Sequence, residues 1–168
     1  LHSSCSPFIN KEPWDYNAVT EQVMRESLKL RHQLFPYLYT MNYRTHTECK
    51  PLVMPMYYTH PECRYAYDVK NQYWFGDQMI VAPITEKNNT GSQMGHVRAW
   101  IPQGIWTDFF TGRVYDGLDG RMLDLYRNDY SIPVLCKAGA IIPMQAHVAH
   151  DNRLGGAEKL EILVFPGA

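Results

Sequence analysis

The chain has 168 residues, of which 45% are hydrophobic and 20% charged, an ordinary globular composition that predicts one domain or two small ones. Sixteen Lys and Arg against seventeen Asp and Glu leave a net charge of -1, which excludes a basic field for binding nucleic acid or an anionic membrane. A complete eightfold β/α barrel is also excluded, because it needs about 200 residues or more. The longest strongly apolar stretch, residues 79–84, is far shorter than the roughly 18 residues of a membrane span.

Apolar residues in the first third of the chain recur at helical spacing. Within residues 16–47 they stand at steps of three, four or seven, which lines one face of a helix: Val19, Val23, Leu30, Leu34, Leu38 and Met41. Pro36 lacks an N–H and crowds the preceding turn, so the pattern predicts two helices or one kinked helix. Asp15 or Asn17 can cap the first helix, and Pro36 suits the first turn of a second.

After Pro51 the helical period disappears, and short runs rich in Val, Ile, Tyr and Trp alternate with Gly, Pro, Asn and Asp. These runs predict strands at residues 72–75, 78–84, 97–101, 105–110, 121–126, 130–135, 140–143 and 159–165. The change of period predicts helices confined to residues before about 51 and an antiparallel sandwich from about residue 70 onward. Residues 146–157 are expected to form a linker, and the strand that begins at Lys159 has no predicted partner after it.

Two His-x-x-Cys units offer the residue types of a zinc site. His46 and Cys49 form the first unit, His60 and Cys63 the second, and two imidazoles with two thiolates would complete a tetrahedral shell. Structural zinc sites more often show Cys-x-x-Cys pairs in a small domain that lacks another core, so the favoured interpretation is four unrelated side chains. A zinc-stabilised domain is kept as an alternative, and no cofactor is predicted.

The cysteines and the first residues bear on the compartment. Four cysteines are too sparse and irregular for a disulfide scaffold in a chain of this size, so reduced thiols are the default, which favours the cytoplasm. Residues 1–8 lack the charged and apolar regions of a signal peptide. The chain nevertheless begins with Leu rather than Met, and the compartment stays open.

The sequence contains no common catalytic motif. Neither a Gly-x-Ser-x-Gly nucleophile elbow nor a phosphate-binding glycine loop is present. Most of the acidic residues flank turns or alternate with apolar strand residues, which favours a solvated face: Asp68, Asp77, Asp108, Asp124 and Asp129. Residues 100–110 are rich in aromatics, as in a sugar-stacking platform, but their alternation at strand period favours core packing. A non-catalytic carbohydrate-binding or interaction module therefore stays open as an alternative.

Several short motifs, taken in order, carry a family resemblance. They include Leu1-His2-Ser3-Ser4, Lys11-Glu12-Pro13-Trp14, residues 34–40, Phe75-Gly76-Asp77, residues 81–84, residues 100–108, Ile132-Pro133-Val134, residues 138–143 and residues 160–167. In this order they resemble glycoside hydrolase family 31, the retaining α-glucosidases and α-xylosidases. The resemblance spans nearly the whole chain.

The resemblance implies an α+β fragment in three parts. Residues 1–51 would be the C-terminal end of the catalytic (β/α)8 barrel, namely the end of strand eight, its loop and the closing helices. Residues 52–146 would be the proximal C-terminal domain, an antiparallel all-β sandwich, and residues 147–168 a linker with the first strand of a distal β domain. The family's two catalytic aspartates lie on earlier barrel strands, so this chain is expected to be inactive alone. The expected partner is an α-linked oligosaccharide or glycoside, with no nucleic acid or membrane and a homo-oligomer left open.

One substrate contact is carried over from the resemblance, and two positions depart from it. His2 matches the histidine at the mouth of strand eight that hydrogen-bonds sugar hydroxyls beside the scissile bond, at the end of the barrel where such folds have their active sites. Met54-Pro55-Met56 stands where Arg-Pro-Leu is common, and Cys49 stands where a Gly is usual after the helix. The resemblance assigns no catalytic residue and no metal ligand in this chain.

Overall fold

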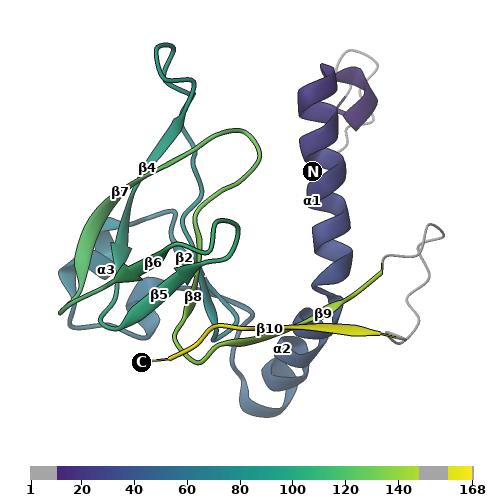
Figure 1. Ribbon diagram of the computed structural model, residues 1–168. Coiled ribbons are helices and arrows are strands. Elements are labelled where there is room, and N and C mark those ends of the chain that lie inside the picture. Colours follow the sequence, from purple (N-terminus) through teal and green to yellow (C-terminus); the bar gives the residue numbers. More distant parts are fainter. Residues whose placement is uncertain (1–10, 148–158, 168) are drawn as a thin grey trace.

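The computed structural model describes residues 11–147 and 159–167, and its first part is helical (Figure 1). A 3-10 turn at Pro13–Asp15 precedes α1 (Ala18–Gln33) and α2 (Phe35–Glu48). The backbone N–H of Thr20 donates to Asn17 Oδ1 at 2.9 Å, which caps α1. Pro36 lies in the first turn of α2, where its missing N–H has no helical partner to lose. Both helices and the break between them are therefore confirmed.

The strands of the remaining described residues form antiparallel sheets. The strands are β1 (Val53–Pro55), β2 (Tyr73–Phe75), β3 (Met79–Val81), β4 (Gly95–Ile101), β5 (Ile105–Asp108), β6 (Val114–Asp116), β7 (Arg121–Arg127), β8 (Val134–Lys137), β9 (Ile141–Gln145) and β10 (Leu160–Val164). Six of them make one sheet in the order β1-β2-β3-β8-β5-β6, while β4 pairs with β7 and β9 with β10. Every pairing is antiparallel, which confirms the expected architecture of barrel-closing helices followed by a β-sandwich.

Two expectations about the β half are wrong in detail. Helices are not confined to residues before 51, because α3 (Arg64–Asp68) and a 3-10 turn at Met56–Tyr58 lie between β1 and β2. Five residues are too short for a helical period to be visible in the sequence. The strands β1 and β6 were not predicted, since each has three residues and β1 ends in Pro55, a residue that argues against a strand.

The strand that begins near Lys159 does have a partner in the described chain. β10 pairs with β9 over five positions, from Leu160 opposite Gln145 to Val164 opposite Ile141. The backbone N–H of Ala146 also donates to the carbonyl of Lys159 at 3.0 Å. The partner strand thus precedes β10 in the chain.

The six-stranded sheet is buried on both faces because its central strands alternate between two apolar clusters. Ile80 and Leu135 face the first cluster, which includes residues of the β4–β7 pair: Ala99, Trp100, Ile101 and Leu125. Met79 and Cys136 face the second, which contains residues from α2, β9 and the end of the chain: Tyr37, Met41, Ile142, Met144 and Phe165. The sheet thus forms the middle layer between the β4–β7 pair and α2 with β9.

Asp108 is a structural carboxylate, contrary to the expectation of a solvated face. Its side chain is 0% exposed and forms an ion pair with Arg127, which is 8% exposed. Asp108 Oδ1 also accepts hydrogen bonds from the backbone N–H groups of Phe110 and Thr111, at 3.0 and 2.8 Å. The carboxylate therefore ties the turn after β5 to the end of β7.

Cys49 ends α2 in a left-handed backbone conformation, with φ 55° and ψ 30°. An L residue with a Cβ is strained there, and Gly is the usual solution. We expect Cys49→Gly to raise the free energy of unfolding by roughly 0.5–1 kcal/mol, the relief of strain being partly offset by the freer unfolded chain. Urea titration measures this, with Cys49→Ala as the control that keeps the Cβ. Equal stability of the Gly and Ala variants would contradict the strain.

Candidate functional site

The substrate contact predicted from the sequence, His2, lies outside the described residues, and its role stays a prediction. Cys5 and Phe8, which the family resemblance places on the loop after strand eight, lie outside the described residues as well. In the part of the chain that the structure describes, no helix is both long and apolar enough to cross a membrane. The described residues nevertheless contain the features that position the barrel end against the sandwich.

The four side chains of the zinc hypothesis do not converge. His46 and Cys49 lie at the end of α2, whereas Cys63 precedes α3 and His60 packs on two tryptophans. The His60 ring meets Trp100 edge-on with centroids 5.0 Å apart, and burial there lowers the pKa of His60. Among the described residues, no group of three or more His, Cys, Asp or Glu could hold a metal ion. The zinc interpretation has no geometric support in these residues.

The aromatic segment at residues 100–110 belongs mainly to the core. Trp100 and Trp106 are each 3% exposed, and Trp106 Nε1 donates to the carbonyl of Pro102 at 2.9 Å. Their faces pack in the first apolar cluster and are not available to a sugar. The prediction of core packing is confirmed for both tryptophans. Neither ring is therefore available as the sugar-stacking face of a carbohydrate-binding module.

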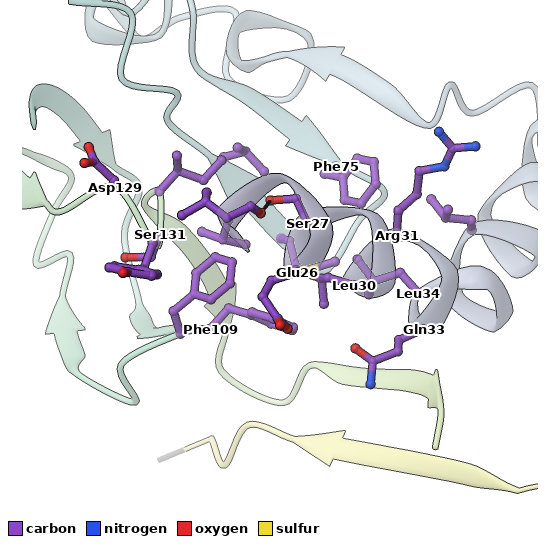
Figure 2. Close-up of a pocket in the computed structure, with 18 of the residues that line it drawn as sticks. Glu26, Ser27, Leu30, Arg31, Gln33, Leu34, Phe75, Phe109, Asp129 and Ser131 are labelled. Carbon is purple, nitrogen blue, oxygen red and sulfur yellow. Dashed lines mark hydrogen bonds between the residues drawn. The ribbon is translucent and has the colours of Figure 1, made fainter. Parts of the chain in front are cut away.

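A groove of about 680 Å³ lies between α1 and the six-stranded sheet (Figure 2). Its walls are largely apolar and come from α1, the residue that joins α1 to α2, β2, β3, the turn after β5 and the loop before β8: Val23, Leu30, Leu34, Phe75, Val81, Phe109, Tyr130 and Ile132. α1 buries none of its residues, and Val19 near its start is 46% exposed. The apolar stripe of α1 is therefore only partly covered by the described chain.

Two carboxylates reach this groove, and neither is arranged for catalysis. Figure 2 shows Asp129 at one end and Glu26 nearer the middle, on different elements. Asp129 Oδ1 accepts a hydrogen bond from Asn88 Nδ2 at 2.7 Å, and Glu26 lies 3.5 Å from Lys29 Nζ. Glycoside hydrolysis needs two carboxylates facing one bond, about 5–5.5 Å apart in a retaining enzyme. The groove therefore has the character of a packing surface.

The turn between β2 and β3 fastens the helices to the sandwich. Its motif Phe75-Gly76-Asp77 lies on α2, where Tyr37 Oη donates to the Phe75 carbonyl at 2.7 Å and Arg44 forms an ion pair with Asp77. Gly76 has φ +67°, and a Cβ there would lie 2.1 Å from Tyr37 Oη. The backbone N–H of Gly76 donates to the Leu52 carbonyl at 2.6 Å. We call this set of contacts the junction.

The charge of Asp77 makes the junction sensitive to acid. Partial burial raises the pKa of this carboxyl, but hydrogen bonds from Arg44 and Gln78 outweigh it and hold the pKa below its ordinary value. Because the folded-state pKa is lower than the unfolded one, the stabilisation is complete above about pH 4 and is lost as pH falls further.

We therefore expect Asp77→Asn to destabilise the chain most at neutral pH, with the difference from wild type shrinking below about pH 4. Urea titrations at a series of pH values measure it. Asp119→Asn, the same change at an exposed turn position, is the control. A deficit of Asp77→Asn that stays constant down to pH 2 would contradict the proposed role of the charge.

Residues 49–142, more than half of the chain, match the family model described as the glycosyl hydrolase family 31 C-terminal domain. The chain belongs to glycoside hydrolase family 31. Residues 1–41 match a second model, the TIM-barrel domain of the same family. The two family 31 matches are separated by residues 42–48, the second half of α2, which includes Arg44 of the junction. The family resemblance drawn from the sequence motifs is thereby confirmed.

The curated relatives of the chain include an α-glucosidase and an α-xylosidase. The chain is 28% identical over 138 residues to α-glucosidase 2 of Bacillus thermoamyloliquefaciens. The aligned region covers 82% of this chain and 16% of the relative. It is 26% identical over 172 residues to the α-xylosidase of Saccharolobus solfataricus, covering 99% of this chain and 22% of the relative. The chain thus spans about a fifth or less of the length of these relatives.

Solved structures of family 31 share the fold. The cycloalternan-forming enzyme from Listeria monocytogenes, in complex with a pentasaccharide substrate, matches with a TM-score of 0.83 and 30% identity, covering 99% of this chain and 16% of that one. A dextranase of Flavobacterium johnsoniae, complexed with glucose, matches with a TM-score of 0.78 and 26% identity over 94% of this chain and 18% of its own. Both structures contain a bound sugar.

Proposed function

We propose that this chain supplies the closing part of the catalytic barrel and the adjoining β-sandwich of a retaining α-glycosidase. That enzyme would hydrolyse terminal α-glucosidic or α-xylosidic bonds in oligosaccharides, as the names of the curated relatives suggest. The observation that carries the proposal is the order of the two family matches, barrel first and C-terminal domain second, along one chain.

The proposed division of labour follows from this order. Residues 1–51 would complete the barrel, residues 52–146 would form the proximal sandwich, and residues 147–168 would lead into a distal β domain through β10. The partly covered stripe of α1 and the apolar groove beside it would pack against the earlier part of the barrel. The junction would then hold the end of the barrel at a constant position relative to the sandwich.

The chemistry in the proposed enzyme needs two carboxylates that are contributed by earlier barrel strands. One attacks the anomeric carbon, and the other protonates the leaving oxygen and later activates water. His2, at the end of strand eight, would donate a hydrogen bond to a sugar hydroxyl beside the scissile bond. The 168-residue chain would then contribute one substrate contact and the scaffold that supports it.

We expect the purified 168-residue chain to hydrolyse neither aryl α-glucosides nor aryl α-xylosides above background, because it lacks both the nucleophile and the acid. Release of the aryl group is followed by absorbance, and far-UV circular dichroism confirms that the chain is folded. Protein expressed from a reading frame that includes about 400 or more preceding residues is expected to turn over one of the two substrates.

Two results would overturn the proposed function. One is turnover by the 168-residue chain that a transition-state mimic of α-glucosidases abolishes. The other is a reading frame with an initiator Met directly before Leu1, because the two catalytic aspartates would then be missing from the protein.

A further inference from the structure

Three tyrosines of the Met56–Tyr58 turn and α3 stack on one another. The rings of Tyr57 and Tyr67 are parallel to within 7°, with centroids 5.0 Å apart. Tyr58 meets Tyr57 nearly edge-on, with centroids 5.4 Å apart. Tyr67 Oη donates to the carbonyl of Pro61 at 3.0 Å, which orients its ring. We call Tyr57, Tyr58 and Tyr67 the tyrosine cluster.

The tyrosine cluster is largely exposed and takes no part in the core. Its members and the neighbouring Tyr65 keep large exposed fractions: Tyr57 39%, Tyr58 62%, Tyr65 48% and Tyr67 50%. The same segment contributes Met56 and Ala66 to the first apolar cluster instead, at 1% and 3% exposed. Contiguous aromatic rings at a surface mark a binding site more often than isolated ones do. Folding of the described residues does not account for these rings.

The charged residues in the segment of the tyrosine cluster balance one another, which favours a neutral ligand. The segment that carries the cluster has two acidic and two basic residues, all exposed, and their formal charges cancel: Glu62, Asp68, Arg64 and Lys70. Such a surface provides no net field to attract a nucleic acid or a strongly charged peptide. It does provide flat rings together with hydrogen-bonding groups, the combination that binds a molecule with one apolar face and a polar edge.

We propose that the tyrosine cluster binds a neutral oligosaccharide chain, an α-linked glucan, through stacking of sugar rings on its exposed aromatic faces. A pyranose ring presents C–H groups on its face and hydroxyls around its edge, which matches exposed tyrosine rings that each carry a hydroxyl. Contacts among the rings hold them in place beforehand, so little side-chain entropy is lost on binding. The choice of glucan rests on the proposed function, whereas the site itself is a separate inference about binding.

Affinity electrophoresis of the 168-residue chain in native gels tests this site without any need for turnover. We expect amylopectin or dextran in the gel to retard the wild-type chain, and hydroxyethylcellulose, a β-linked polymer, to retard it much less. Tyr58→Ala and Tyr67→Ala should each weaken binding by about two- to tenfold, the range for loss of one aromatic contact. Tyr58→Phe keeps the ring and should bind like wild type.

Tyr43→Ala is the matched control, because Tyr43 on α2 is 62% exposed, the same fraction as Tyr58. It should leave the retardation unchanged, and thermal melts should show all variants folded. Absence of retardation of the folded wild-type chain, or equal effects of Tyr43→Ala and Tyr58→Ala, would overturn the inference. Sedimentation that shows a dimer dissociated by Tyr58→Ala would also overturn it, by assigning the tyrosine cluster to self-association. If amylopectin or dextran retarded a longer protein that cleaves no α-glycoside, the proposed function would be refuted and this site would stand.

Discussion

In the proposed full-length glycosidase, His2→Ala is expected to lower kcat/KM on its best α-glycoside by about 100-fold, or about 3 kcal/mol. As the glycosidic bond breaks, the sugar approaches an oxocarbenium ion, and hydrogen bonds to its hydroxyls strengthen. A donor held at the end of a barrel strand contributes to that stabilisation without reorganising, so the loss should appear in kcat as well as in KM. Steady-state kinetics on an aryl α-glycoside measure both.

Cys5→Ala is the control for this experiment, since the family resemblance assigns no sugar contact to Cys5. It should keep nearly full kcat/KM, and thermal unfolding of the His2→Ala protein should match wild type. Full kcat/KM of His2→Ala on every α-glycoside that the parent cleaves would show that His2 does not contact the substrate.

Gly76→Ala is expected to lower the free energy of unfolding by about 3 kcal/mol and the Tm by roughly 10 °C. Two effects add at this position. An L residue is strained at φ +67°, and its Cβ would lie 2.1 Å from Tyr37 Oη and 2.8 Å from Met41 Sδ. Tyr37 is 1% exposed and bonded to the Phe75 carbonyl, so it has little room to move. Urea and thermal unfolding of the 168-residue chain measure the change.

Gly112→Ala separates the two effects. Gly112 has nearly the same φ, +69°, but a Cβ there meets nothing within 4 Å. Gly112→Ala should therefore lower the free energy of unfolding only by the cost of backbone strain, about 1 kcal/mol. Equal losses for the two variants would show that the close approach of Gly76 to Tyr37 does not stabilise the junction.

The helices and most strands were predictable because their signals are local. The stripe that includes Leu30 and Leu34 predicted helices, and Pro36 predicted where one ends and the next begins. Runs rich in Val, Ile and Trp predicted strands, and apolar residues of neighbouring strands, such as Ile80 and Leu135, fill one apolar cluster. Short elements such as β1 and α3 give no period long enough to detect, since packing against the core decides their conformation.

The junction and the sheet order could not be read from local patterns. Arg44 and Asp77 pair across 33 positions in the chain, and nothing near either residue indicates its partner. The insertion of β8 between β3 and β5 likewise depends on long-range pairing. Only the family motif Phe75-Gly76-Asp77 pointed to this turn, and its physical reason, a close approach to α2, became visible in the structure.

The stereochemistry of the first product tests the proposed activity most directly. Protein expressed from the longer reading frame would be mixed with an aryl α-glucoside or aryl α-xyloside in an NMR tube, and the anomeric proton of the released sugar followed from the first minutes. A retaining pair of carboxylates inverts the anomeric carbon twice. The α-anomer is therefore expected first, with the β-anomer appearing only as mutarotation proceeds. Initial release of the β-anomer, or no cleavage of either substrate, would contradict the assignment of this chain to a retaining α-glycosidase.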